Sequence, residues 1–273
     1  MKQCMVGLGL RSAHYEFLQD SPKTQIKWFE AVSENYIDTH GRPRAILELV
    51  RKNYPVALHG VSLAIASAEG LNEDYLLRLR KLADEIEPFI ISDHLCWTGL
   101  KDNNIHDLLP FPYNQDSLKI VLDNIDRAQN ILGRQLLIEN ISSYMMFSIS
   151  DMTEFEFIAE IAQRSGAQVL LDINNIFVSS SNLKLDAKKC LDTIPAHLVG
   201  QIHLAGFTDM GEFLFDTHSK PVCSEVWQLF SYFIEKSPNV PFMIEWDDDI
   251  PEFFRAQEEA LKAKKIWDHH HGT

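Results

Sequence analysis

Short apolar runs alternate with longer amphipathic stretches along this chain of 273 residues. Eight of the runs are almost continuously apolar, which is typical of parallel strands that are buried on both faces of a sheet. These runs occupy residues 5–10, 27–32, 55–60, 88–94, 135–140, 168–173, 199–204 and 241–246. We therefore predict a strand in each of the eight segments.

Most segments between these runs carry apolar residues at three- and four-residue spacing, which is the period of an amphipathic helix. The clearest are RAILELVRKN, NEDYLLRLRKLADEI, QDSLKIVLDNIDRAQNILG, EFEFIAEIAQRSG and EVWQLFSYFIEKS. Two of these helices should end at Gly133 and Gly166, because glycine favours the left-handed backbone that closes a helix. Eight strands that alternate with helices predict parallel pairing and an α/β fold, a single (β/α)8 barrel of the TIM type.

We assign residues 1–268 to this barrel and residues 269–273 to a C-terminal tail. The tail contains His269, His270 and His271, which we expect to lie beyond the last helix and therefore leave out of any site.

Six of the predicted strands carry, in their last or last but one position, a residue that can bind a metal ion, namely His59, His94, Glu139, Asp172, His203 and Glu245. The carboxyl ends of the strands are where TIM barrels carry their active sites. Side chains alternate along a strand, so the residues two positions earlier share the same face. Those residues are mostly small or apolar, as a narrow barrel interior requires: Ala57, Ser92, Leu137, Leu170, Gln201 and Met243. We therefore expect the six polar side chains to converge on the barrel axis.

Each of the six has an ordinary structural explanation when it is considered alone. A histidine at a strand end is often a hydrogen-bonded core residue, and an acid there often caps the next helix or joins an ion pair. All six together are harder to explain, because converging carboxylates would repel one another. Divalent cations would remove that repulsion, so the pattern predicts a metal site.

Three more side chains extend the predicted site. Asp216 and His218 are separated by one residue in the loop after the seventh strand, so in extended chain they point the same way. Asp247 lies two residues after Glu245 and could be a ligand, a base or an acceptor for a ligating imidazole. By strand parity, Asn174 shares the face of Asp172 and Asn175 does not. We take Asp247 and Asn174 as candidate catalytic residues.

The number of ligands bears on the number of ions. Four imidazoles and four carboxylates are too many for one octahedral ion, and carboxylates bridge readily, so two or three ions fit better. A ligand set of nitrogen and oxygen atoms fits iron, manganese or zinc and does not choose among them.

Composition and charge narrow the classes of function. The chain is 45% hydrophobic and has a net charge of −14 without a basic stripe, which argues against nucleic-acid binding. No apolar run approaches the roughly 18 residues of a membrane span, and the first residues lack the apolar core of a signal peptide. The four cysteines are scattered without a CxxC pair, so we expect reduced thiols and a cytoplasmic protein.

An ordered series of motifs runs from residue 7 to residue 249. It comprises GLGLRSAHY, ENYIDTHG, LHGVSLAIAS, SDHLCW, LLIENIS, LLDINNIFVSSSN, IHLAGF, DTH and IEWDDD. Together these motifs resemble the multinuclear non-heme iron-dependent oxidative enzymes, a family long filed as a domain of unknown function. Any one motif is weak, and the specificity of the resemblance lies in the ordered set, which covers nearly the whole chain.

The resemblance implies a xylose-isomerase-like TIM barrel that holds two or three iron ions, with manganese or zinc as alternatives in the isolated protein. It implies an O2-using oxidase that modifies cysteine residues of a ribosomally made precursor peptide, together with a separate peptide-recognition protein. The positions that bind metal in the family match His59, His94, Glu139, Asp172, His203, Asp216, His218 and Glu245. Asn174 and Asp247 lie beside them, and Asp247 could manage protons.

Other classes of function share such a barrel. An endonuclease-IV-like hydrolase fits poorly with the charge of −14, because duplex binding needs cationic contacts to phosphates. A xylose-isomerase-like isomerase would usually need a lysine near the metals, and no predicted strand ends in one. A non-catalytic binding barrel is the third alternative, and eight ligands around an open site argue against it.

Overall fold

The computed structural model describes residues 4–100 and 103–272, and eight parallel strands in it close into a barrel. The strands are β1 (Val6–Gly9), β2 (Trp28–Val32), β3 (Val56–Gly60), β4 (Ile90–His94), β7 (Leu137–Glu139), β8 (Gln168–Asp172), β9 (Val199–Leu204) and β12 (Phe242–Ile244). Their order around the barrel is β1-β12-β9-β8-β7-β4-β3-β2. Each lies within one of the eight predicted segments, which confirms the TIM-type barrel.

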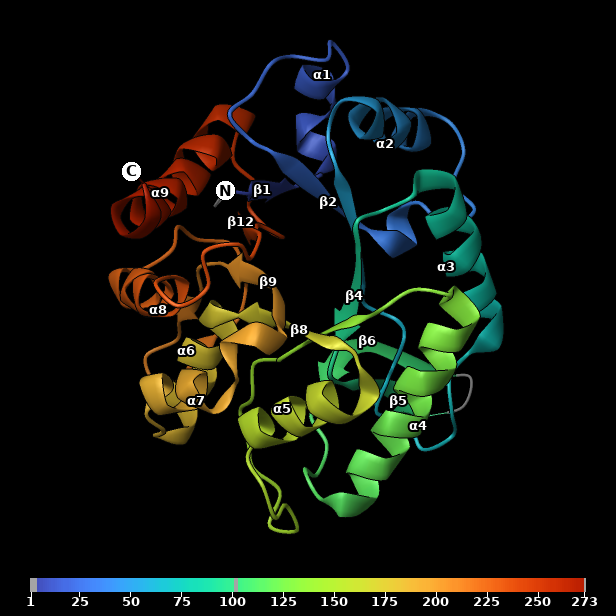
Figure 1. Ribbon diagram of the computed structural model, residues 1–273, viewed down its shortest axis with the longest axis vertical. Coiled ribbons are helices and arrows are strands. Elements are labelled where there is room, and N and C mark those ends of the chain that lie inside the picture. Colours follow the sequence, from blue (N-terminus) through green and yellow to red (C-terminus); the bar gives the residue numbers. More distant parts are fainter. Residues whose placement is uncertain (1–3, 101–102, 273) are drawn as a thin grey trace.

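Helices surround the barrel (Figure 1). They include α2 (Arg42–Asn53), α3 (Glu73–Ile86), α4 (Gln115–Leu132), α5 (Glu154–Ser165), α8 (Ser224–Ile234) and α9 (Phe253–His271), and a short α1 (Tyr15–Leu18) follows β1. The five helices predicted from periodicity are all present. Gly133 and Gly166 cap α4 and α5 with φ values of 65° and 72°, the left-handed conformation expected of them.

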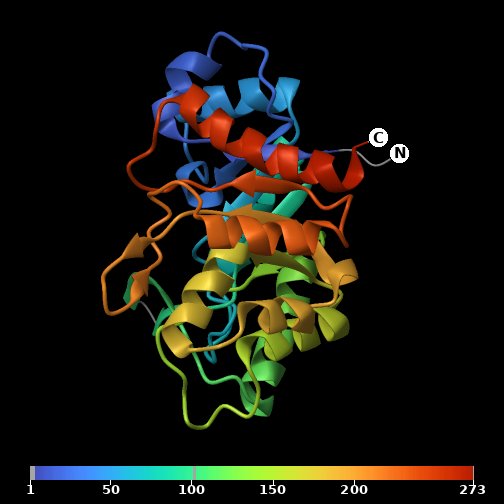
Figure 2. The same ribbon diagram turned by 90° about the vertical axis from the view of Figure 1, so that its left-hand side faces the viewer.

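Several elements were not predicted from the sequence. They are the helices α6 (Ile173–Leu183) and α7 (Ala187–Thr193), the hairpin of β5 (Trp97–Leu100) and β6 (Asn103–Leu109), and the hairpin of β10 (Thr208–Asp209) and β11 (Leu214–Phe215). Short 3-10 turns cover residues 12–14, 33–35 and 196–198. The β10–β11 hairpin projects on the side of the molecule opposite the termini (Figure 2).

The position expected for the terminal histidines was wrong. Helix α9 continues through His269, His270 and His271, and the Nε2 atom of His270 lies 2.9 Å from the Oγ atom of Ser231 on α8. These histidines therefore belong to the helical layer.

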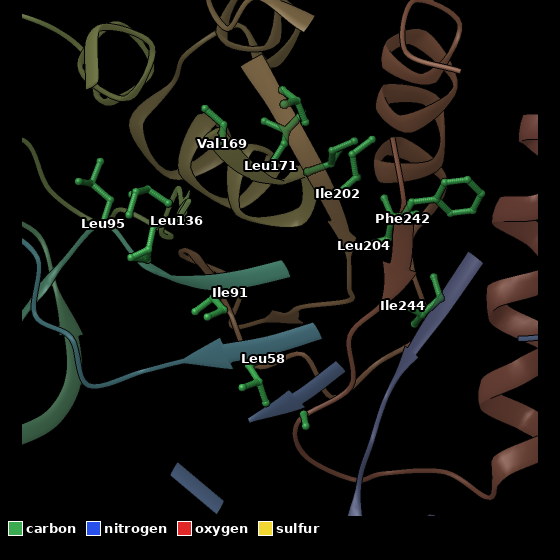
Figure 3. Close-up of a cluster of buried hydrophobic side chains, with 14 of the residues drawn as sticks. Leu58, Ile91, Leu95, Leu136, Val169, Leu171, Ile202, Leu204, Phe242 and Ile244 are labelled. Atoms are coloured by element: carbon green, nitrogen blue, oxygen red, sulfur yellow. The ribbon is translucent and has the colours of Figure 1, made fainter. Parts of the chain in front are cut away.

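The main hydrophobic core lies between the strands and the helices. Figure 3 shows strand side chains that take part in it, among them Leu58, Ile91, Leu171, Ile202 and Ile244, all of them buried. In the alternate positions of the strands, a separate cluster of Trp28, Ala57 and Met243 fills the barrel interior. Because this apolar cluster occupies the barrel below the strand ends, the polar residues collect at the carboxyl ends. Within the described residues, no helix is long and apolar enough to cross a membrane.

Candidate metal centre

Strand register brings the predicted strand-end residues together. His94 on β4 pairs with Glu139 on β7, and Asp172 on β8 pairs with His203 on β9. These residues are between 0% and 8% exposed, so ionisable groups here are removed from water. Such groups need partners or ions, since an unpaired buried charge is costly.

Ligand atoms within the described residues form three groups that could each hold a metal ion. The groups are His59, His94 and Glu139; then Glu139, Asp172, His203 and Glu245; and then His218, Glu245 and Asp247. Glu139 belongs to the first two groups and Glu245 to the last two. Carboxylates that are shared in this way are suited to bridging adjacent ions.

The histidines of the first group are oriented by bonds to their outer nitrogens. The Nδ1 atom of His59 lies 2.8 Å from Ser92 Oγ, and that of His94 lies 3.1 Å from the carbonyl oxygen of Gly60. The Nε2 atoms of both rings then face Glu139 Oε2, at 3.3 Å and 3.2 Å. A histidine that donates one N–H to a carbonyl presents its other nitrogen as a metal ligand.

Glu30 is a site residue that the sequence analysis missed. It lies on β2, is 1% exposed, and its Oε1 atom is 3.1 Å from His203 Nε2. Gln201 donates to the other oxygen of Glu30 at 2.5 Å. On the opposite side of the ring, His203 Nδ1 lies 2.9 Å from Glu245 Oε2. Glu30 therefore fixes His203 with Nδ1 toward the ligand group. The available signal was strand parity, which places Glu30 on the same face as Trp28.

Asp172 has both roles that the sequence left open for an acid at a strand end. Its Oδ1 atom accepts a hydrogen bond of 2.6 Å from the backbone N–H of Asn175 and so caps α6. Its Oδ2 atom points into the ligand group, 3.9 Å from His218 Nε2. Asn140, the residue after β7, holds the backbone of Asp172 by two hydrogen bonds, at 2.9 Å and 3.0 Å.

The loop residues join the cluster through His218. Its Nε2 atom is 2.8 Å from Asp216 Oδ1, while its Nδ1 atom is 3.2 Å from Glu245. Asp216 belongs to none of the three ligand groups. Its Oδ1 atom also accepts a hydrogen bond of 2.9 Å from the side chain of Asn174. His218 has a φ of 45°, an uncommon conformation for a non-glycine residue. Such strain is found at functional sites.

Asn175 does not follow strand parity, because the chain turns from strand to helix at residue 173. Helical geometry directs Asn175 toward the site, where its Oδ1 atom lies 3.4 Å from His218 Nε2 and accepts from Ser142 Oγ at 3.0 Å. Asn174 is also fully buried. Both asparagines therefore border the cluster.

Arg11 is a second residue that the sequence analysis missed. Its guanidinium is buried and lies 2.5 Å from Asp247 Oδ1 and 3.6 Å from Glu245 Oε1. It also donates to the carbonyl oxygen of Trp246 at 2.9 Å. Arg11 thus fixes the segment after β12, and Asp247 keeps its other oxygen 3.1 Å from His218 Nδ1.

Protons balance the buried charges when no metal is considered. Burial alone would lower the pKa of His203, but the carboxylates of Glu30, Glu245 and Glu139 outweigh it and raise that pKa well above 6.5. The pKa of His218 is likewise raised, against burial, chiefly by Asp216. Burial raises the pKa of Glu139 to about 7.

The other acids and imidazoles show the same competition. Burial and the neighbouring carboxylates raise the pKa of Asp172 well above its usual value. Burial would also raise the pKa of Glu245, but the two histidines beside it lower that pKa well below 4.5. Burial and His94 lower the pKa of His59, so His59 is neutral, as a ligand must be.

The donor set fits metal ions. Three buried atoms that face the ligand groups make no hydrogen bond of good geometry in the described part of the chain: Glu139 Oε2, Asp172 Oδ2 and His203 Nδ1. Glu139 Oε2 and His203 Nδ1 lie near only ionisable groups of the cluster, the imidazoles of His59 and His94 and the carboxylate of Glu245. Buried polar atoms are rarely left in this state. All three belong to residues of the ligand groups, so ions bound there would satisfy them. The buried cluster can therefore bind metal ions through nitrogen and oxygen atoms.

Comparison with protein families gives a match over residues 5–268 to the model described as "RiPP precursor modification enzyme MbnB/TglH/ChrH". The chain belongs to this family. RiPPs are ribosomally made peptides that are modified after synthesis, so membership identifies an enzyme and implies a peptide substrate. The resemblance inferred from the ordered motifs is confirmed.

Relatives with less informative names are similar over nearly their whole length. A UPF0276 protein of Rhizorhabdus wittichii is 47% identical over 271 residues, covering 99% of this chain and 97% of that protein. One of Caulobacter vibrioides is 46% identical over 261 residues, covering 96% and 93%.

Solved structures share the fold at low sequence identity. A xylose isomerase domain containing protein from Salmonella typhimurium has a TM-score of 0.64 at 14% identity, covering 96% of this chain and 97% of that one. A D-psicose 3-epimerase from Clostridium cellulolyticum has a TM-score of 0.63 at 8% identity, covering 97% and 98%. The xylose-isomerase-like barrel is therefore confirmed, and at these identities the likeness concerns the fold alone.

Proposed function

We propose that the enzyme is a multinuclear, iron-dependent oxidase that uses O2 to modify cysteine residues of a ribosomally made precursor peptide. Two or three iron ions would be held by His59, His94, Glu139, Asp172, His203, Asp216, His218 and Glu245. The observation that carries the proposal is the chain of three ligand groups joined through Glu139 and Glu245, in a member of a precursor-modifying family.

When bound, the irons would supply Lewis acidity toward a cysteine sulfur and electrons for the reduction of O2. The protein's own residues hold and orient the site. Ser92, the Gly60 carbonyl and Glu30 orient the histidines, while Asn140 and Arg11 fix the backbone that carries Asp172 and Asp247.

Asp247 is the proposed proton carrier. Its side chain is 46% exposed, whereas Glu245 beside it is only 6% exposed, so Asp247 lies between the cluster and solvent. It contacts His218 on one oxygen and Arg11 on the other. Asn174 would serve as a positioning residue for Asp216, to which it donates a hydrogen bond.

The partners proposed are a cysteine-containing precursor and a separate protein that recognises it. The test uses a short peptide and a small protein encoded beside the gene, added to the iron-loaded enzyme. With O2 admitted, the mass of the native peptide should change at its cysteine. A matched Cys→Ser peptide, an enzyme without iron and a reaction without O2 should all give no product. Equal oxidation of the Cys→Ser peptide would exclude sulfur as the reacting group.

A further inference from the structure

An apolar groove of about 720 Å³ opens beside the metal centre. It is lined by Leu108, Pro110, Tyr144, Met145, Phe213 and Phe215, which we call the aromatic groove. The three rings lie 6.1 to 6.3 Å apart in an open triangle, so none covers another face to face. Tyr144, Met145, Phe213 and Phe215 are each between 40% and 59% exposed. This volume falls in the range of roughly 300 to 1,000 Å³ that is typical of ligand sites.

The groove adjoins the metal centre. Asp216 and Ser142 form part of its lining, and these residues contact His218 and Asn175 respectively. A molecule with a reacting group at the cluster would therefore extend into this groove.

The walls of the groove are held in place by the elements that build the cluster. The backbone N–H of Asp216 donates to the Tyr144 hydroxyl at 3.0 Å. Asn182 on α6 makes two hydrogen bonds to the backbone of Leu214 on β11, at 2.9 Å and 3.0 Å. Since α6 begins at the Asp172 cap, the ring-bearing hairpin has a fixed position relative to the metal ligands. A preformed site of this kind binds with little ordering cost.

The charges that line the groove disfavour an acidic ligand. The ionisable lining residues are Asp107 and Asp216, and no lysine, arginine or histidine of the described chain lines the groove. An acidic side chain would meet only like charges there, while an apolar side chain would bury surface against the rings.

We propose that the aromatic groove binds an apolar side chain that neighbours the reacting cysteine in the substrate peptide, and that it disfavours an acidic one. This inference rests on the proposed function, which supplies the cysteine peptide. It adds a specificity determinant outside the ligand cluster, formed by Tyr144, Met145 and the two phenylalanines of the β10–β11 segment.

The test uses acetylated, amidated peptides Gly-Xaa-Cys-Xaa-Gly with the anaerobic, iron-loaded full chain. With p-benzoylphenylalanine as Xaa, irradiation should cross-link the peptide to residues 144–145 or 213–215. In competition experiments with unlabelled peptides, the peptide with phenylalanine as Xaa should bind at least tenfold more tightly than the peptide with serine. The peptide with glutamate should bind most weakly. Cross-links confined to other segments, equal affinities, or no cross-link at millimolar peptide would each overturn the proposal.

Variants separate the groove from the rest of the surface. Phe213→Ser and Phe215→Ser should each weaken binding of the phenylalanine peptide about tenfold and leave binding of the serine peptide unchanged. Both variants should retain the full metal content. Phe254→Ser is the matched control, because Phe254 is 61% exposed and lies on α9 outside the groove. An equal effect of all three substitutions would contradict the proposal.

Failure of the proposed function has a different signature. Binding is measured without O2, so a peptide that cross-links in the groove but stays unmodified when O2 is admitted would refute only the oxidase. A peptide that is oxidised while it cross-links elsewhere would refute only the groove. If Phe213→Ser instead weakens binding of the separate peptide-recognition protein and leaves the binding of every peptide unchanged, that protein is the occupant of the groove and the proposal is wrong.

Discussion

At the scale of single residues, Asp172 divides its two oxygens between a helix and the metal cluster. Oδ1 caps α6, and Oδ2 faces the ligands. Asparagine retains an acceptor for the cap but lacks the charge and one of the oxygens. We therefore predict that Asp172→Asn keeps the stability of the metal-free protein but loses at least one bound ion.

Asp172→Ala is the comparison variant. It should lose the ion as well and also about 1 kcal/mol of unfolding free energy, because the cap acceptor is absent. Urea unfolding of the metal-free proteins and elemental analysis of the reconstituted ones provide the two measurements. Full metal content in both variants would show that Asp172 is only a cap.

Glu30 acts on the site through His203. Removal of an outer acceptor from a ligating histidine typically lowers metal affinity by about 10- to 100-fold. We predict a loss of this size for Glu30→Gln, measured by competition with a chelator of known affinity. Glu259→Gln is the control, since Glu259 is also fully buried but pairs with Arg255 and Lys262 on α9. Similar losses in both variants would indicate a general effect of removing a buried acid.

The site residues that could be predicted from the sequence are those that occupy the same position, the carboxyl end, in several strands. His59, His94 and the other strand-end residues share one position at the barrel mouth, so strand parity was enough to bring them together. Glu30 and Arg11 come from strands or loops whose ends carry no ligand. Their roles depend on contacts between segments that are far apart in the sequence. Glu30 and His203 are 173 residues apart, and Arg11 and Asp247 are 236 residues apart. Strand parity places Glu30 on the inner face of its strand, but it does not reveal the contact with His203, and no local pattern encodes the contacts of Arg11.

At the scale of elements, the barrel strands and long helices were predictable because each has a clear hydrophobic period. Helix α6 was not, since INNIFVSSSNL is rich in residues with modest helix propensity. The Asp172 cap and burial against the barrel override that propensity. The β5–β6 and β10–β11 hairpins are short and carry little apolar alternation, so their strands gave no signal.

Helix α5 begins with a buried acid that makes stability depend on pH. Glu154 accepts hydrogen bonds from the backbone of Ile141 at 2.9 Å and from Ser143 Oγ at 3.0 Å, which anchors the loop after β7. Burial raises the pKa of Glu154 from 4.5 to about 7. The folded state therefore binds this proton more tightly than the unfolded state, so its contribution to stability is present at pH 4.5 and is lost as the pH rises to 7.

Glu154→Gln should lack this loss, because glutamine does not ionise. We predict that the free energy of unfolding of the variant, relative to the native protein, rises by roughly 3 kcal/mol between pH 4.5 and pH 7.5. Urea unfolding of both metal-free proteins at the two pH values measures the difference. A relative stability that stays constant with pH would contradict the assigned pKa.

At the scale of the whole molecule, protons lower the net negative charge at the polar end of the metal-free barrel. His203 and His218 have raised pKa values, and so does Asp172. Metal ligands must be deprotonated, so metal binding should release about two protons or more per chain at pH 7. Affinity should accordingly fall as the pH falls. Calorimetric titration with Zn2+ in buffers of different ionisation enthalpy measures the release, and identical heats in all buffers would contradict it.

The central expectation for the whole molecule is a metal centre with more than one ion, because the three ligand groups share Glu139 and Glu245. Mössbauer spectroscopy of protein reconstituted without O2 with isotopically enriched iron tests this most directly, with elemental analysis of the same sample. We predict two or three iron ions per chain in distinguishable environments. A single environment at one ion per chain, in protein that fully modifies its peptide, would contradict the account.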